Sequence, residues 1–211
     1  MKNAIKKFFR QDSWINHATN LGVSSSRTNN TVYSPSLVLQ KQTLEGLYND
    51  DGISQRIVEA VVADALKGFI NAEVELLEEM KRITAKQKIF EAGSFGRLYG
   101  GALLVAFIDD GQEMSKPLNH NRIHKLASLQ VFDKHQVTFE DEDICHDIYL
   151  EHFGQPEIYT INKQGVGYST DEFKGIRIHR SRCFLFSGKR LSTTATTRNK
   201  GWGGSVLQAC Y

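Results

Sequence analysis

The clearest periodic pattern of the chain lies between residues 53 and 67. Apolar residues recur there every four positions, at Ile53, Ile57, Val61 and Ala65, and Val58, Val62 and Leu66 widen the stripe. This period predicts an amphipathic helix with one broad buried face. Asp51 directly precedes the stripe and is well placed as the N-cap. A shorter helix is predicted just before it, over residues 43–49.

A second helical segment is predicted over residues 72–97. Its first half is acidic and its middle is basic, which suits the helix dipole and allows pairs between successive turns. Its apolar positions are sparse, which indicates a half-exposed helix. Gly93 and Gly96 weaken its end, so we expect a break near them.

The pattern changes to strands after residue 101. Residues 102–108 are apolar on both faces, which predicts a buried strand, and Asp109-Asp110-Gly111 is a turn signal. Further strands are predicted at residues 128–132, 148–152, 157–161, 175–179 and 183–187. Helices followed by a mixed, mostly antiparallel sheet indicate an α+β fold.

Composition adds a domain plan and excludes some classes of protein. The chain has 211 residues, 40% apolar and 24% charged, which is ordinary for one globular domain. Residues 1–39 read as an arm and a Ser/Asn/Thr-rich linker, and residues 40–211 as the domain. The net charge of +2 argues against a dedicated sequence-specific nucleic-acid binder.

Cellular context can be predicted from the same composition. The longest apolar run is too short to span a bilayer, so no membrane partner is expected, and the N-terminus lacks the features of a signal peptide. Cys145, Cys183 and Cys210 are widely spaced and odd in number, which indicates reduced thiols in a cytoplasmic compartment.

Several patterns that could carry chemistry are better explained by structure. Residues 97–101 (RLYGG) lack the GxxxxGK[ST] order of a phosphate loop, and we interpret them as a helix-to-strand turn. The Asp pairs at 50–51 and 109–110 are interpreted as caps and turns, and the acidic residues 141–143, with Cys145 and His146, as a solvated loop. We predict no catalytic residue, no metal site and no cofactor.

The most basic region lies near the end of the chain. The candidate residues for an interface or for DNA-phosphate contact are Arg180, Arg182, Lys189, Arg190, Arg198 and Lys200, with Trp202 as either an interface anchor or a core residue. Such a cluster can contact phosphates non-specifically. A solvated face or an intersubunit salt-bridge surface is the favoured interpretation.

Seven blocks along the chain resemble the portal protein family of tailed bacteriophages. They are LY (47–48) with DDGI (50–53), RIVE (56–59) with DAL (64–66), RLYGGALL (97–104), LQVFD (129–133), YLEHFGQPEIY (149–159), HRSR (179–182) with FSG (186–188), and GWGGSVL (201–207). Within this family, the chain resembles the subgroup whose longer members carry an anti-CBASS-like domain. The resemblance covers about residues 40–208, which correspond to the first part of the family's wing.

This resemblance implies a structural role. The family forms a ring, typically of twelve subunits, at the capsid vertex through which double-stranded DNA is packaged and ejected. The implied partners are other copies of the chain, terminase, scaffold and capsid, a head–tail adaptor, and DNA bound non-specifically. The implied location is the virion, and the host cytoplasm during assembly. No enzymatic activity is implied.

Family members continue well beyond the position of Tyr211, into the channel-lining helices, so we expect a wing-like domain truncated before them. A non-functional prophage fragment is therefore one alternative. The other is a two-histidine phosphoesterase acting on cyclic nucleotides, because His17-Ala18-Thr19 and His179-Arg180-Ser181 are H-x-[ST] elements, as in the related anti-CBASS proteins. Arg180 departs from that pattern, which requires an apolar residue after each histidine.

Overall fold

The computed structural model describes residues 39–68, 70, 72–162 and 175–209. All of these except Leu39 belong to one compact unit, Gln40–Tyr211. The predicted arm and linker, and with them His17, lie outside the described residues. Within the part that the structure describes, no helix combines the length and the apolar character needed to cross a bilayer.

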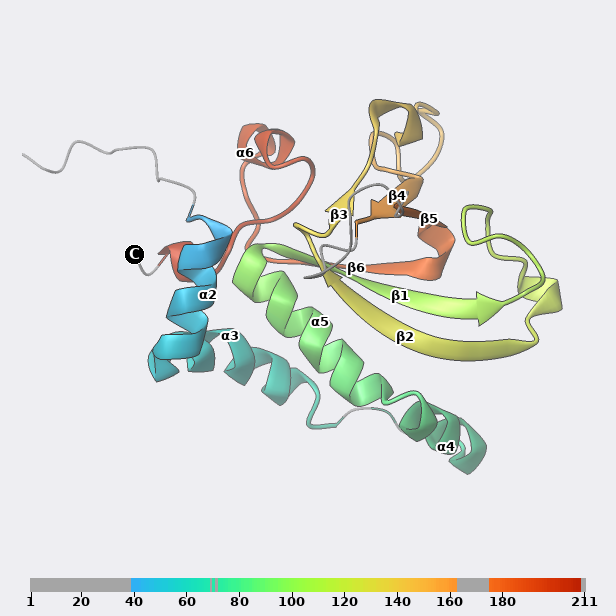
Figure 1. The fold of residues 1–211 in the computed structure, drawn as a ribbon, viewed down its shortest axis with the longest axis horizontal. Helices are drawn as coiled ribbons and strands as arrows, with labels where there is room; N and C mark the ends of the chain where they lie inside the picture. Colours follow the sequence, from blue (N-terminus) through green and yellow to red (C-terminus); the bar gives the residue numbers. More distant parts are fainter. Residues whose placement is uncertain (1–38, 69, 71, 163–174, 210–211) are drawn as a thin grey trace, which may run out of the picture. The chain divides into compact units, whose positions relative to one another are not determined.

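Most of the helices precede the strands, and this segregation is typical of an α+β fold (Figure 1). The helices are α2 (Lys41–Asp50), α3 (Gly52–Ala65), α4 (Val74–Arg82), α5 (Ala85–Tyr99) and the late α6 (Thr193–Arg198). The strands are β1 (Gly101–Asp109), β2 (Lys125–Asp133), β3 (Val137–Thr138), β4 (Ile158–Ile161), β5 (Ile176–His179) and β6 (Cys183–Ser187). Short 3-10 turns are η2 (His120–Arg122), η3 (Asp141–Asp143), η4 (Arg180–Arg182) and η5 (Leu207–Ala209). The predicted fold class is confirmed.

The strands form two small antiparallel sheets, ordered β2-β1-β6 and β3-β4-β5. Strand β1 is central, and its alternate residues face two different cores. Leu104 and Ala106 pack with Ala92 of α5, whereas Leu103 and Val105 pack with residues of the second sheet and with Trp202. This double packing explains why β1 is apolar from Ala102 to Ile108.

The structure corrects the second predicted helix. Residues 72–97 form two helices, because Thr84 adopts the left-handed conformation (φ 52°) between α4 and α5. Gly93 and Gly96 do not break α5. A Cβ at Gly93 would lie 2.8 Å from a methyl group of Val62, and one at Gly96 would lie 3.0 Å from the carbonyl oxygen of Phe186. The two glycines therefore let α5 pack closely against α3 and β6.

Helix α3 matches its predicted position, but its buried face is narrower than predicted. The carboxylate of Asp51 accepts hydrogen bonds from the backbone N–H groups of Ile53 and Ser54, which confirms the N-cap. Val58 and Val62 are buried, whereas Ile53 and Val61 are 72% and 55% exposed. An apolar row of α3 therefore faces outward.

The predicted strand at residues 148–152 is wrong. These residues form turns in the loop between β3 and β4, where Ile148 and Tyr149 are exposed. The predicted strands at residues 128–132, 157–161, 175–179 and 183–187 correspond to β2, β4, β5 and β6.

Candidate functional site

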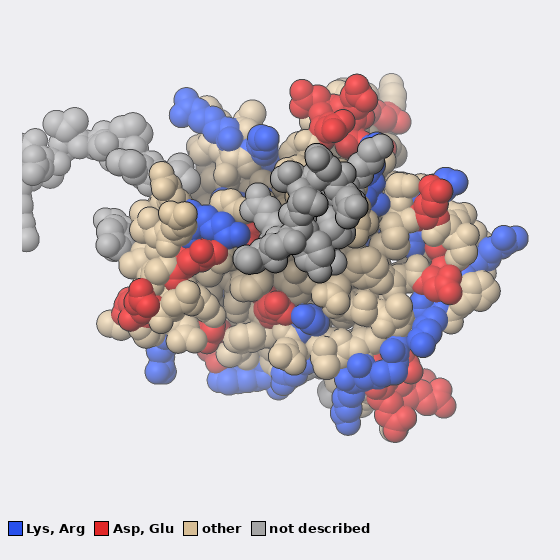
Figure 2. Space-filling model, viewed as in Figure 1, with Lys and Arg blue, Asp and Glu red and all other residues tan. Residues whose placement is uncertain are grey.

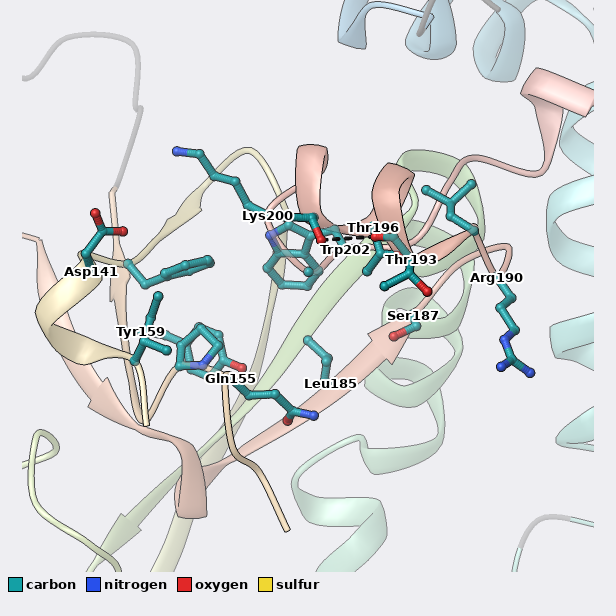
Figure 3. A pocket seen from close by; sticks show the side chains of 17 residues that line it. Asp141, Gln155, Tyr159, Leu185, Ser187, Arg190, Thr193, Thr196, Lys200 and Trp202 are labelled. Atoms are coloured by element: carbon teal, nitrogen blue, oxygen red, sulfur yellow. Dashed lines mark hydrogen bonds between the residues drawn. The ribbon is translucent and has the colours of Figure 1, made fainter. Parts of the chain in front are cut away.

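A groove of about 800 Å³ lies between the loop that joins β3 to β4 and the segment that follows β6 (Figure 3). The β3–β4 loop contributes Asp141, Ile144 and residues 154–156 to one wall. The other wall comes from α6 and its flanks, with Arg190, three threonines and Lys200. Tyr159, Leu185 and Trp202 also contribute to the lining. A volume of this size falls in the range of ordinary ligand sites.

The α6 wall is shaped by the turn that ends the helix. Lys200 and Gly201 adopt left-handed backbone angles (φ 52° and 81°), and the N–H of Gly201 donates to the carbonyl of Thr196 (2.9 Å). The amide group of Asn199 then donates to the carbonyl of Trp202 (3.0 Å). This turn reverses the chain after α6. Trp202, which follows the turn, is therefore buried in the core.

Trp202 is a core residue that also lines the groove. Only 6% of its surface is exposed, and it packs with Leu103, Val105 and Tyr159. Its indole lies against the backbone at Gly101, where a Cβ would come within 2.1 Å of the ring. The core alternative for Trp202 therefore holds, and the residue shapes the groove from beneath.

The predicted basic cluster is divided between the surface and the interior. Lys189, Arg190, Arg198 and Lys200 are exposed, and two of them, Arg190 and Lys200, line the groove with Trp202. Figure 2 shows basic side chains over α6 and acidic side chains over the β3–β4 loop. Arg180 is only half-exposed, and its Nη1 atom is buried without a hydrogen-bond partner.

Arg182 is fully buried and cannot meet DNA in this fold. Its guanidinium donates to the Asp110 carboxylate (2.7 Å) and to the carbonyl oxygens of Ile108 (3.2 Å) and Lys116 (3.3 Å). The placement of Arg182 at an interface is thus corrected: its charge is neutralised by Asp110. Sequence analysis interpreted Asp110 only as a turn residue, and no local pattern connects positions 110 and 182.

The Asp110 carboxylate is held ionised by several donors. Hydrogen bonds from the backbone N–H of Asn119 and from Arg182 lower its pKa to about 2, against the opposing effect of desolvation. The N–H of Gln112 adds a third donor (3.2 Å). Its neighbour Asp109 accepts from the N–H of Gly111, as the turn interpretation predicts. These partners leave Asp110 fully occupied by the protein's own donors.

His179 ends β5 and caps the turn η4. Its Nδ1 atom lies 2.9 Å from the hydroxyl oxygen of Ser181 and accepts from the backbone N–H of Ser181 (3.2 Å). The same hydroxyl oxygen accepts from the N–H of Leu118 (2.8 Å). Burial lowers the pKa of His179, with smaller effects from nearby charges. The H-x-S element therefore has a structural explanation as a capped turn.

Residues 97–101 form the predicted helix-to-strand turn. Gly100 adopts a left-handed angle (φ 92°) and its N–H donates to the carbonyl of Gly96. A Cβ at Gly100 would lie 2.4 Å from the carbonyl oxygen of Gly203, so two glycine segments lie in direct backbone contact. Sequence analysis identified the turn but missed the contact, because the two segments are a hundred residues apart.

The groove lining carries charges of both signs. Asp141 lies toward one end and Arg190 toward the other, whereas the Lys200 side chain extends from the α6 side toward the Asp141 end (Figure 3). Burial raises the pKa of Tyr159, so its phenol stays protonated at neutral pH. The described lining includes neither histidine nor cysteine.

Residues 42–211 match a family model described as phage portal protein. The chain is 26% identical to a Caulobacter protein (strain RHG1) named anti-CBASS protein Acb1, over 95% of this chain and 32% of that protein. It is also 26% identical to a Sphingomonas paeninsulae protein of the same name, over 97% of this chain and 32% of that protein. The chain spans about a third of the length of these curated relatives.

Proposed function

The chain belongs to the phage portal protein family, and we propose that it is a structural wing portion of the portal ring. The ring would stand at the capsid vertex and pass double-stranded DNA during packaging and ejection. The match of the family model to residues 42–211, nearly the whole described fold, carries this proposal. Terminase, scaffold and capsid, and a head–tail adaptor are the proposed partners, in the virion and in the host cytoplasm during assembly.

Exposed apolar side chains on the described fold support self-association. Ile53 and Val61 belong to one row of α3, and Val74 at the start of α4 is 71% exposed. Apolar residues at the core of a subunit interface are typically exposed in the isolated subunit. The outward apolar row of α3 is therefore the surface that we assign to contact with a neighbouring copy.

The exposed basic residues support weak, sequence-independent contact with DNA. Lys189, Arg190, Arg198 and Lys200 stand within a short segment and are solvent-exposed. Phosphate contacts by such side chains carry no sequence information. The near-neutral total charge suits a ring along which DNA slides, because tight binding would oppose translocation.

The experiment that tests the ring is the solution mass of the purified chain. Light scattering on the size-exclusion peak is expected to give about a dozen copies of the 23.8 kDa chain, and negative-stain images of that peak are expected to show rings. The physical reason is burial of the α3 row between neighbouring copies. A monomer at all accessible concentrations would contradict ring formation by this chain.

A pair of charged substitutions identifies the surface. Ile53→Glu with Val61→Glu is expected to reduce the mass to that of a monomer or small oligomer, because two carboxylates would be buried at the interface. Ala63→Glu is the matched control, since Ala63 is also exposed on α3 but points away from Val61 by the helical period. Equal masses for all variants would exclude the α3 row as the contact.

The alternative function is a two-histidine phosphoesterase acting on cyclic nucleotides. The name of the two relatives, anti-CBASS protein, favours it. Among the described residues, His179 has a pKa that burial lowers, which would suit a neutral base. However, its Nδ1 atom is engaged with Ser181, and the second histidine lies outside the described residues.

Substitution of His179 separates the two functions. In a structural protein, His179→Ala is expected to leave the oligomeric mass unchanged, because the lost cap lies on a short turn. In a phosphoesterase it would abolish cleavage of cyclic oligonucleotides, measured by chromatography of the products. The control is His146→Ala, which changes an exposed loop histidine. If the wild type cleaves these substrates and His179→Ala does not, the enzymatic function replaces the structural proposal for this chain.

A further inference from the structure

Three potential metal ligands converge in the loop between β3 and β4. The Sγ atom of Cys145, a ring nitrogen of His152 and a carboxylate oxygen of Glu157 all lie within 4.8 Å of one another. The Nε2 atom of His152 lies 3.5 Å from Oε1 of Glu157. Sequence analysis placed Cys145 in a solvated acidic loop beside His146. The loop instead turns His152 toward the thiol, while His146 is exposed.

The backbone of the loop fixes these three positions. The N–H of Cys145 donates to the carbonyl of Gln155, and the N–H of Gly154 donates back to the carbonyl of Cys145, both at 2.9 Å. Next to this pair, the N–H of Glu157 donates to the carbonyl of Asp143 (2.7 Å). Gly154 adopts a left-handed angle (φ 75°) that allows the chain to reverse. The ligand-bearing segments are thus held together by main-chain bonds before any ion binds.

We propose that Cys145, His152 and Glu157 form a Zn²⁺ site. Thiolate, imidazole and carboxylate are the ligand types of zinc, whereas Ca²⁺ and Mg²⁺ require oxygen donors. Tetrahedral bonds of about 2.0–2.1 Å to nitrogen and oxygen put these two ligand atoms roughly 3.3 Å apart. The separation of 3.5 Å between His152 and Glu157 already matches this spacing.

The surroundings of the thiol fit a metal ligand. Cys145 is only 4% exposed, and its Sγ atom lies 4.0 Å from the carbonyl oxygen of Asp147 and also interacts with the Glu157 side chain. His152 and Glu157 are half-buried and leave a side open to solvent. On binding, the thiol releases its proton to water as the Zn–S bond forms, and a water molecule completes the tetrahedron.

A zinc ion here would stabilise one wall of the groove. Gly154, Gln155 and Pro156 line the groove and lie between the ligands His152 and Glu157 in the sequence. A bond from the metal to each ligand would restrain this segment against the strands. The site is independent of the ring proposal, because it concerns the loop alone.

The test is a metal titration of the full chain after chelation and removal of the chelator. Zn²⁺ is added with calorimetric readout, and Co²⁺ is added as a spectroscopic probe of thiolate ligation in a tetrahedral field. We expect one ion per chain, a thiolate-to-cobalt charge-transfer band, and a raised Tm with Zn²⁺. No binding, or Co²⁺ binding without the charge-transfer band, would overturn the proposal.

Matched variants locate the site. Cys145→Ser, His152→Ala and Glu157→Gln are expected to weaken Zn²⁺ binding by more than about a hundredfold, the upper effect of losing a residue that only supports a ligand. Residues of the same types outside the site serve as controls: Cys183→Ala, His146→Ala and Glu151→Gln are expected to bind as the wild type does. Far-UV circular dichroism verifies the fold of each variant. Undiminished binding in all three ligand variants would overturn the site, as would equal losses in the controls.

Discussion

Arg182→Ala is expected to lower the free energy of unfolding by about 3–5 kcal/mol, the cost of removing one partner of a buried ion pair. The substitution leaves the buried Asp110 carboxylate without its cation, and it removes the donors to two carbonyl oxygens. A loss of this size is a large fraction of the stability of an ordinary domain. Urea unfolding followed by circular dichroism measures it.

Two comparisons separate the buried pair from a general charge effect. Lys67→Ala removes an exposed pair with Asp64, and we expect a loss below about 1 kcal/mol. Arg182→Lys keeps the charge but cannot supply the planar fork that reaches three acceptors, so its stability should lie between those of the wild type and Arg182→Ala. Equal midpoints for Arg182→Ala and Lys67→Ala would contradict the assigned role.

The same pair predicts a pH dependence. The folded pKa of Asp110 is lowered to about 2, below its ordinary value of 3.8. A lowered folded pKa contributes stability that is present above the unfolded pKa and is lost as the pH falls through the folded one. The acid limb of the stability profile should therefore fall between about pH 4 and pH 2. Asp110→Asn should flatten this limb.

Local patterns predicted the elements whose environment is set by their own residues. Helix α3 follows from its period and from Asp51, and strand β1 follows from a continuous apolar run that two cores require. The break at Thr84 could not be predicted, since threonine rarely adopts a left-handed angle and the surrounding fold imposes it. The pattern of residues 148–152 resembles a strand but finds no partner strand.

The candidate sites depended on contacts between distant residues. Arg182 meets Asp110 across 72 positions, so composition alone placed it wrongly with the surface cations. Cys145, His152 and Glu157 have no recognised ligand spacing, and only the reversal of the loop brings them together. Burial of Trp202 could not be predicted from its glycine neighbours, because the same sequence fits an exposed anchor. The sequence therefore gives the type of each residue but not the distant residue that it contacts in the fold.

Three of the blocks by which the chain resembles the portal family meet at one point of the fold. RLYGG, FSG and GWGGS contribute Gly100, Gly188 and Gly204, whose backbones lie in mutual contact. The N–H of Gly188 donates to the carbonyl of Gly100 (3.1 Å), and Lys189 and Gly204 exchange two hydrogen bonds of 2.8 Å. The glycines of these blocks therefore share a physical purpose: they let three segments approach without side chains between them.

Gly188→Ala is accordingly expected to destabilise the fold by about 3 kcal/mol, at the upper end of overpacking costs. The new Cβ would lie 2.4 Å from the carbonyl oxygen of Gly204, 2.5 Å from that of Gly96 and 2.7 Å from the Cα of Gly100. All three are backbone atoms, so no side-chain rotation relieves the clash, and at least one segment must move. Differential scanning calorimetry would record a Tm lower by several degrees.

The matched control is Gly52→Ala at the first position of α3, where an added Cβ meets nothing within 4 Å. Alanine is the better helix former, so this variant should be neutral or more stable by up to about 1 kcal/mol. Because Gly188 also joins the groove-lining β6 to the segment before α6, Gly188→Ala should change the groove as well as the stability. A Gly188→Ala protein with the wild-type Tm would mean that the three segments are looser than their contacts indicate.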